Sequence, residues 1–305
     1  MSISELLQKV PRVIRSQWRH FEYNLSRKIN LNWFDIARYQ LLLGERPNLK
    51  NPKTWSEKLL WLNRNWQPDI KSECADKLKV RDYVRNKGLD FLLVPLLGVW
   101  STPEEINFES LPNQFVLKCN HGSGCNIVCT DKSKLDFEQA KKNLAYWLTL
   151  DYGKLFNEKH YSKIKPIIFC EKFLPFLANN SSLIDYKLHC FNGIPQFFDV
   201  LSNRDNEKHQ VSFANYSLNW ELLDYAKNSI SENEIVPRPI SLDKMIEYAV
   251  VLIESFPYAR VDFYEIDGIP FFGEITFTPA ANIDCDYKME IQYLMGEKLI
   301  LPKQN

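Results

Sequence analysis

Two acidic residues near the C-terminus, Asp262 and Glu274, have the type and spacing of a metal site. They lie in VDFYEIDGIPFFGEITFTP, where the pair Asp267-Gly268 predicts a hairpin turn between two strands. Glu274 and Thr276 are two residues apart and therefore share one face of the second strand. Carboxylates among apolar neighbours are costly unless a cation lies between them. Mg²⁺ shared with the phosphates of a nucleotide would supply that cation.

The metal interpretation depends on the register of this hairpin. If the Asp-Gly pair were the whole loop, Asp262 would lie opposite Gly273 and face away from Glu274. A three-residue loop or a bulge brings Asp262 directly opposite Glu274. The alternative is that Asp262 pairs with Arg260 or a lysine, while Glu274 is an edge residue facing water.

The segment FVLKCNHGSG could bind phosphate. Lys118 ends an apolar strand, and the loop Gly122, Ser123 and Gly124 offers backbone N–H groups that can wrap an anion. No Gly-Lys-Ser/Thr sequence opens a helix, so this is not the P-loop pattern. A plain hairpin turn is the alternative. His121 either contacts phosphate or substrate, or is an exposed turn residue.

Two further stretches carry weaker signals. IIFCEKFLPF reads as a buried strand whose end could hydrogen-bond the rim of adenine, with Phe173 and Leu174 over its face. The alternative is a core strand that leaves its sheet at Pro175. Lys187 and Arg204 lie in or just after strands and could meet phosphates or a substrate carboxylate, or they could be surface cations.

The remaining pattern predicts the elements that position these residues. Thr54 and Glu57 have the spacing of a capping box at the start of a helix. Asn192-Gly193 predicts a second hairpin turn. Hairpins outnumber regular βαβ units, so the sequence predicts an α+β fold. Helices are expected in the first sixty or so residues and over 74–88, 131–150, 243–256 and 288–301, with strands over 91–100, 115–120, 126–130, 167–174, 185–203 and 210–220.

Composition excludes several classes of protein. There are 38 basic and 38 acidic residues, so no net charge attracts nucleic acid. No apolar run is long enough for a bilayer, and the N-terminus lacks the pattern of a signal peptide, so we expect a cytoplasmic protein. Seven cysteines without a CxxC pair suit reduced thiols. The basic, aromatic N-terminal helices could contact a membrane surface or a partner enzyme, or simply pack with a solvated basic face.

The order of these motifs resembles the ATP-grasp superfamily, from about Cys74 to Ala281. More narrowly, the chain resembles the TupA-like ATP-grasp family. The stretches that carry this resemblance are WSEKLLWLN, DKLKVRDYV, FVLKCNHGSG, CEKFL, DYKLHCFNGIP and RVDFYEIDGIPFFGEITFTP.

The resemblance implies an ATP-grasp fold, in which two lobes with antiparallel sheets clamp ATP. Residues 1–73 would form an N-terminal helical region, and residues 74–305 would form the ATP-grasp domain. Within that domain, the small lobe would cover about 110–172 and the large lobe about 173–290.

The resemblance also implies roles for individual residues. Mg²⁺ would be held by Asp262, Glu274 and Thr276, although the superfamily commonly has Asn at the third position. Arg204, Arg260 and Lys187 would stabilise the transferring phosphoryl group or a tetrahedral oxyanion. ATP would be contacted by Lys77, Lys118, Gly122, Ser123, Gly124, Glu171, Lys172, Phe173, Leu174, Asp185 and Lys187.

The activity implied is ligation of a carboxylate to an amine through an acyl phosphate, with ATP and Mg²⁺ as cofactors. By family association, the carboxylate would belong to a uronic acid of a surface or capsular polysaccharide or its precursor, and the amine to an amino acid or another small molecule. Three alternatives remain: a glycosyltransferase, an ATP-dependent sugar kinase and a non-catalytic scaffold. A common nucleotide-sugar glycosyltransferase would want a parallel sheet and often a D-x-D motif, and the only literal match is DCD at 284–286.

Overall fold

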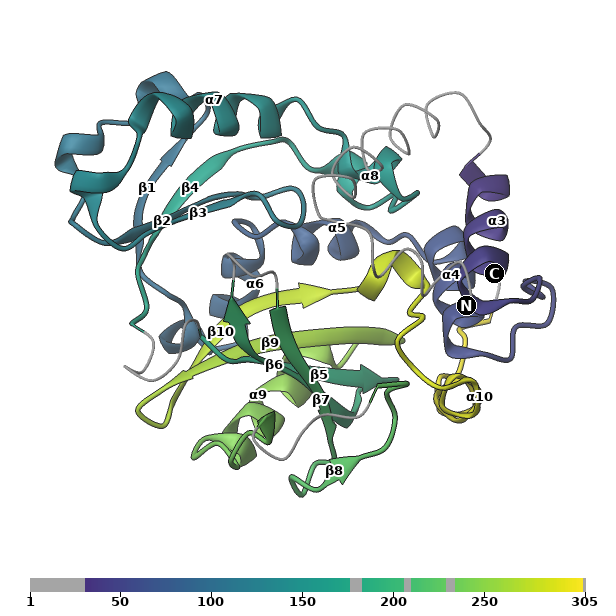
Figure 1. Cartoon of the computed structure of the whole chain (residues 1–305). Helices are drawn as coiled ribbons and strands as arrows, with labels where there is room; N and C mark the ends of the chain where they lie inside the picture. The colour runs from purple at the N-terminus through teal and green to yellow at the C-terminus, as the bar shows by residue number, and fades with distance from the viewer. Residues whose placement is uncertain (1–30, 176–182, 206–209, 229–233, 304–305) are drawn as a thin grey trace.

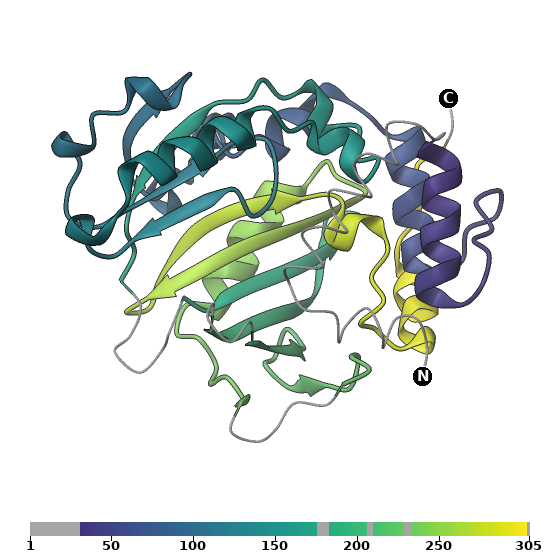
Figure 2. The same ribbon diagram turned by 45° about the horizontal axis from the view of Figure 1, so that its top comes forward.

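Two antiparallel sheets form the framework of the molecule. The computed structural model describes residues 31–175, 183–205, 210–228 and 234–303. The smaller sheet has the strand order β1-β4-β2-β3, and the larger has the order β10-β9-β5-β6-β7-β8. Figures 1 and 2 show the smaller sheet lying above the larger one. This mixture of helices and antiparallel sheets confirms the predicted α+β class.

The smaller sheet packs against helix α7 (Phe137–Leu148), which covers its outer face in Figure 1. Ala140 and Leu144 of α7 share one buried apolar cluster with Phe115 and Leu117 of the sheet. Asp136 caps the helix by accepting a hydrogen bond from the backbone of Gln139 at 2.9 Å, so α7 begins later than predicted. The strands are β1 (Leu96–Trp100), β2 (Phe115–Cys119), β3 (Asn126–Cys129) and β4 (Ile168–Lys172); β1 precedes the range expected for the small lobe.

The larger sheet packs against helix α9 (Leu242–Ile253). The helix is amphipathic and buries Leu242, Met245, Ala249 and Leu252 against the sheet. The strands are β5 (Asp185–Phe191), β6 (Ile194–Asp205), β7 (Gln210–Tyr216), β8 (Leu222–Leu223), β9 (Tyr258–Ile266) and β10 (Ile269–Thr276).

Both predicted hairpin turns are confirmed. Asn192 and Gly193 join β5 to β6 with φ of 50° and 78°, and Asp267 and Gly268 join β9 to β10 with φ of 50° and 77°. Positive φ at both central residues is what a two-residue hairpin turn with the twist of its strands requires.

Three helices cover one end of the larger sheet: α3 (Leu31–Leu43), α4 (Trp55–Asn65) and α10 (Met289–Lys298). The predicted capping box is confirmed. The backbone N–H of Glu57 donates to Oγ1 of Thr54 at 3.2 Å, and the N–H of Thr54 donates to Oε2 of Glu57 at 3.0 Å. The helix expected nearer the N-terminus lies outside the described residues.

The single helix predicted over 74–88 is wrong. The structure has two helices, α5 (Asp69–Ala75) and α6 (Val80–Asn86), separated by a turn. In this turn Oδ1 of Asp76 accepts from the N–H groups of Leu78 at 2.9 Å and Lys79 at 3.1 Å. A short polar side chain that bonds the backbone in this way competes with helix formation.

Short helical turns make up several of the connections: η1 (Asp90–Leu92), η2 (Pro103–Glu105), η3 (Phe108–Ser110), η4 (Lys132–Lys134), α8 (Tyr152–Leu155), η5 (Tyr161–Lys163) and η7 (Pro279–Asn282). Within the described ranges, no helix combines the length and the apolar character needed to cross a membrane.

Candidate active site

Asp262 lies directly opposite Glu274 in the β9–β10 hairpin. Phe272 pairs with Phe263, and the next pair is Glu274 with Asp262, so Gly273 is an extra residue in β10. This is the bulge that the metal interpretation requires, and it is confirmed. A side chain at position 273 would place its Cβ 3.0 Å from the carbonyl oxygen of Asp262, so glycine permits this close approach.

Asp262 is buried and ion-paired with two cations. Arg260 binds it with both arms of its guanidinium, Nε to Oδ1 at 2.6 Å and Nη2 to Oδ2 at 2.8 Å. Lys187, directly across the β5–β9 pairing, places Nζ 2.5 Å from Oδ2. The sequence left open a pairing of Asp262 with Arg260 or a lysine, and the structure has both.

Glu274 is also ion-paired, although β10 is an edge strand. Its Oε2 lies 2.8 Å from Nζ of Lys77, and its Oε1 accepts from Oγ1 of Thr276 at 2.7 Å. Arg260 approaches the same oxygen at 3.5 Å. Burial alone would raise the pKa of Glu274, but the charges of Lys77, Lys187 and Arg260 hold that pKa well below its ordinary value. The carboxylate therefore stays ionised.

The carboxylate oxygens of Asp262 and Glu274 suit Mg²⁺ when an anion binds together with the metal. The three cations around Asp262 and Glu274 outnumber the two carboxylates, so a free metal ion would add to an existing positive charge. Among the described residues, no group of three or more His, Cys, Asp or Glu side chains could hold a metal. The site therefore fits Mg²⁺ that arrives with an anion such as a nucleotide phosphate, since Mg²⁺ is commonly bound by one or two carboxylates plus phosphate oxygens.

Glu171, in the smaller sheet, forms ion pairs with two cations, Lys118 and Arg81. Its Oε2 lies 2.6 Å from Nζ of Lys118, and its Oε1 lies 3.0 Å from Nη1 of Arg81. Arg81 also donates to the carbonyl of Val94 at 2.7 Å. Both carboxylate oxygens are thus engaged, which suits a role in positioning Lys118. Arg81 was not among the residues predicted for the site; its signal is a charged residue beside buried Val80 in an amphipathic helix.

The glycine-rich loop is tied to the segment that follows α7. His121 is buried, and its Nε2 lies 3.1 Å from the carbonyl oxygen of Trp147, which can only accept. The expected exposed turn residue is therefore wrong, and contact of His121 with phosphate or substrate stays a prediction. Tyr152 donates to the carbonyl of Ser123 at 2.7 Å, and a Cβ at Gly122 would fall 2.4 Å from the Tyr152 ring.

The remaining predicted residues are only partly described. Lys172 ends β4 exposed to solvent, with Phe173 and Leu174 half-buried beyond it. Asp185 starts β5 and is buried. Their contacts with ATP stay a prediction. The backbone of Arg204 belongs to β6, but its side chain lies outside the described part of the chain, so its role stays a prediction too.

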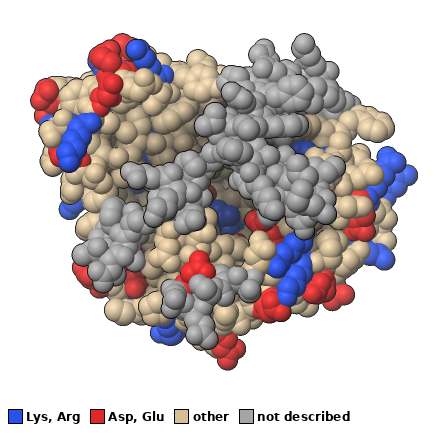
Figure 3. Space-filling view, in the orientation of Figure 1, with Lys and Arg blue, Asp and Glu red and all other residues tan. Residues whose placement is uncertain are grey.

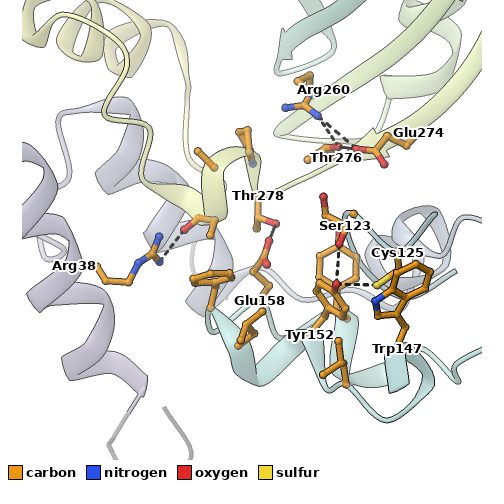
Figure 4. A pocket seen from close by; sticks show the side chains of 18 of the residues that line it. Arg38, Ser123, Cys125, Trp147, Tyr152, Glu158, Arg260, Glu274, Thr276 and Thr278 are labelled. Atoms are coloured by element: carbon orange, nitrogen blue, oxygen red, sulfur yellow. Dashed lines mark hydrogen bonds and ion pairs between the residues drawn. The ribbon is translucent and has the colours of Figure 1, made fainter. Parts of the chain in front are cut away.

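A cleft of about 710 Å³ opens beside these groups. Figure 3, in the orientation of Figure 1, shows a hollow in the face turned toward the viewer, with basic and acidic side chains at its floor. Ser123 and Gly124 line the cleft, and Figure 4 shows Ser123 pointing from its loop toward Thr276. Part of the lining was not predicted, because no local motif marks these residues: Arg38, Tyr146, Trp147, Tyr152, Phe156, Glu158, Tyr161 and Thr278.

Three solved structures illustrate what this chain is similar to in fold. D-alanine–D-alanine ligase from Bacillus anthracis complexed with ATP is 16% identical, covering 67% of this chain and 55% of that chain with a TM-score of 0.39. D-cycloserine synthetase DcsG is 13% identical, covering 76% and 72% with a TM-score of 0.42. The ATP-grasp ligase PsnB with minimal precursor, Mg and ADP is 14% identical, covering 73% and 57% with a TM-score of 0.37.

This chain thus spans little more than half the length of two of these three structures. No curated protein sequence matches it. The sequence profile described as TupA-like ATPgrasp, however, matches residues 57–300, which include every strand of both sheets and the helices from α5 to α10. ATP and Mg²⁺, the cofactors expected from the motifs, are those of this family. The chain belongs to the TupA-like ATP-grasp family.

Proposed function

We propose that the protein is an ATP- and Mg²⁺-dependent ligase that joins a carboxylate to an amine through an acyl phosphate. One observation carries the proposal. Asp262 and Glu274 face each other across the bulge at Gly273, among more cations than carboxylates, beside a cleft. Such a cluster suits a metal-bound polyphosphate, and phosphoryl transfer depends mainly on positioning and neutralising that charge.

In this proposal ATP lies between the two sheets. Lys77 and Lys118 contact its phosphates, and Ser123 with its neighbouring glycines closes over them. Glu171 keeps Lys118 in place through their 2.6 Å ion pair. The linker after β4, beginning with Phe173, covers adenine.

Asp262, Glu274 and Thr276 would hold magnesium, which when bound neutralises and orients the phosphate oxygens. Arg260 contacts all three of these side chains. It therefore lies where a guanidinium can stabilise charge that develops on the transferring phosphoryl group or on a tetrahedral oxyanion. Lys187, which is ion-paired with Asp262, adds a further positive charge beside Arg260.

The substrates we propose are a uronic-acid carboxylate of a surface or capsular polysaccharide or its precursor, and an amino acid or small amine. The support is the family resemblance. The balanced charge of the chain gives no reason to expect nucleic acid as a partner. We place the enzyme in the cytoplasm, with its basic N-terminal helices available to the inner membrane face or to another biosynthetic enzyme. We also keep 1–73 and 74–305 as its helical region and ATP-grasp domain.

One assay tests this function. The full chain is supplied with ATP, Mg²⁺, candidate uronates and candidate amines, and both ADP and free phosphate are measured. Release of both products that requires carboxylate and amine together supports ligation. ADP without free phosphate would indicate a sugar kinase. Consumption of a nucleotide sugar without ATP would instead support a glycosyltransferase and overturn the proposal.

A further inference from the structure

The cleft continues beyond the carboxylates proposed to bind magnesium. Figure 4 shows Glu158 and Thr278 lying between Arg38 on one side and Arg260, Glu274 and Thr276 on the other. All of these residues line the same cleft of about 710 Å³, which is within the usual range for a small-molecule site. The end near Arg38 and Glu158 is therefore continuous with the proposed reaction centre.

Arg38 enters this end of the cleft from α3, outside the residues matched by the family profile. Its guanidinium carbon lies 5.0 Å from the ring centre of Phe156 and 5.6 Å from that of Phe34. Nη1 donates to the carbonyl of Ala281 at 3.4 Å. Ring contacts of this kind hold the planar fork in one orientation, and that fork suits a carboxylate.

Glu158 supplies the opposite charge. It is buried at the cleft wall, and one carboxylate oxygen accepts from Oγ1 of Thr278 at 2.5 Å. Burial raises the pKa of Glu158 to about 7, against the lowering effects of Thr278 and of the charged groups Arg38, Lys71 and Lys77 that face it. A carboxylate with a pKa near neutrality can take up a proton from an amine during turnover.

The backbone beside these charges is held in a strained conformation. Ala280, Ala281 and Asn282 all have positive φ, at 46°, 52° and 72°. Residues with a Cβ rarely adopt this region, and strain of this kind concentrates at ligand-binding segments. Aromatic rings complete the wall: Tyr146, Trp147, Tyr152, Phe156 and Tyr161.

We propose that this end of the cleft binds the amine substrate, and that this substrate is an α-amino acid. Its carboxylate would lie on Arg38 and its amino group against Glu158, directed toward the centre near Glu274. The inference rests on the proposed ligase function and specifies the substrate of one half of that site.

Glu158 takes one proton from the ammonium group, which frees the nitrogen lone pair to form the C–N bond with the acyl carbon. The bond between that carbon and the phosphate oxygen breaks, and phosphate leaves with the electron pair. A second proton passes from nitrogen to the departing phosphate, so the products are an amide, hydrogen phosphate and protonated Glu158.

Binding can be tested without turnover. Saturation-transfer NMR on the full chain, with Mg²⁺ and a non-hydrolysable ATP analogue, is run against the proteinogenic amino acids and against ethylamine and ethanolamine, which lack the carboxylates of alanine and serine. We expect at least one amino acid to bind and the simple amines to bind at least about tenfold more weakly, as loss of a charge-assisted contact implies. Arg38→Met should reduce amino-acid binding to a similar extent and leave amine binding unchanged.

Arg46→Met is the matched control, because Arg46 is exposed just beyond the same helix. Arg38→Lys keeps the charge but loses the fork, and should also weaken binding. Unchanged melting temperatures check that each variant folds. The proposal is overturned if no amino acid binds, if the simple amines bind equally well, or if Arg38→Met binds amino acids like the wild type.

Turnover adds a separate readout. Glu158→Gln should remove the rise in kcat/KM for the amine as the pH increases through about 7. The control Glu138→Gln, on the exposed face of α7, should keep this rise. An unchanged pH profile in Glu158→Gln would contradict the role of Glu158. Failure of the wild type to release ADP with any pair of substrates would count against the ligase function itself. The NMR result distinguishes the two cases, since it requires no reaction.

Discussion

Nζ of Lys77 lies 2.8 Å from Oε2 of Glu274, which joins the turn between α5 and α6 to the last strand of the larger sheet. The backbone N–H of Lys77 also donates to the carbonyl of Asn120 at 3.0 Å, next to the glycine-rich loop. One lysine therefore connects the proposed metal-binding strand with the proposed phosphate-binding loop. A phosphate bound here would share Lys77 with Glu274.

Glu274→Gln should abolish ATP turnover and leave the fold intact. The amide keeps the shape of the side chain but removes the charge that faces Lys77 and the proposed magnesium ion. We expect a loss of at least about a hundredfold in ADP release. Circular dichroism should show an unchanged fold. Glu290→Gln, an exposed change on α10, is the control and should retain full activity.

Arg81→Met should destabilise the protein by about 3 kcal/mol, because it leaves the buried carboxylate of Glu171 with one cation fewer. The same change should raise the KM for ATP, since Arg81 no longer holds Glu171, the partner of Lys118, in place. Arg85→Met is the matched control on α6. Arg85 forms an exposed pair with Asp82, so its loss should change the free energy of unfolding by less than about 1 kcal/mol. Equal losses in urea denaturation would contradict this prediction.

The pH dependence of stability should carry a contribution from Glu158. Its pKa is raised from 4.5 to about 7, so the folded state binds more protons than the unfolded state between these values. The contribution of Glu158 should therefore fall as pH rises from about 4.5 to 7 and stay constant above that. Glu158→Gln removes the titrating group. The difference in unfolding free energy between variant and wild type should grow in favour of the variant across this window, and a flat difference would refute the assignment.

Ala280→Gly and Ala281→Gly should each stabilise the fold by about 1 kcal/mol, because glycine adopts positive φ without steric penalty. Ala145→Gly, at an exposed position inside α7, is a control with the opposite expected sign, since glycine lowers helix stability by about 1 kcal/mol. Thermal and urea unfolding measure both effects. Loss of stability in all three variants would show that the backbone at 280–282 carries no such strain.

Several features followed from the sequence because their physics is local. Asn192-Gly193 and Asp267-Gly268 accept positive φ, so they set the two hairpin turns. The spacing of Thr54 and Glu57 predicted their capping box. The alternation of the β10 residues predicted that a bulge was needed for Asp262 to meet Glu274, and Gly273 provides it.

Other features depended on competition between local and distant partners. An uninterrupted helix over 74–88 was expected from its apolar spacing, but Asp76 bonds the backbone of its own turn and also accepts from Nδ2 of Asn120 at 2.9 Å. His121 looked like an exposed turn residue, yet the carbonyl of Trp147 draws it into the interior. Asn120 and Trp147 are both distant in sequence from the residues that they contact, so these two contacts could not be deduced from the segments alone.

The sequence by itself determined the α+β class, the hairpins, and the order of motifs that identifies the family. Only the tertiary structure decided which charges meet. Arg81 of α6 pairs with Glu171 of β4. Arg38 of α3 lines the same cleft as Glu158, although the two residues are far apart in the sequence. Charge pairing acts through space and falls with distance in ångströms, not in residues, so it becomes visible only when the sheets and helices have packed.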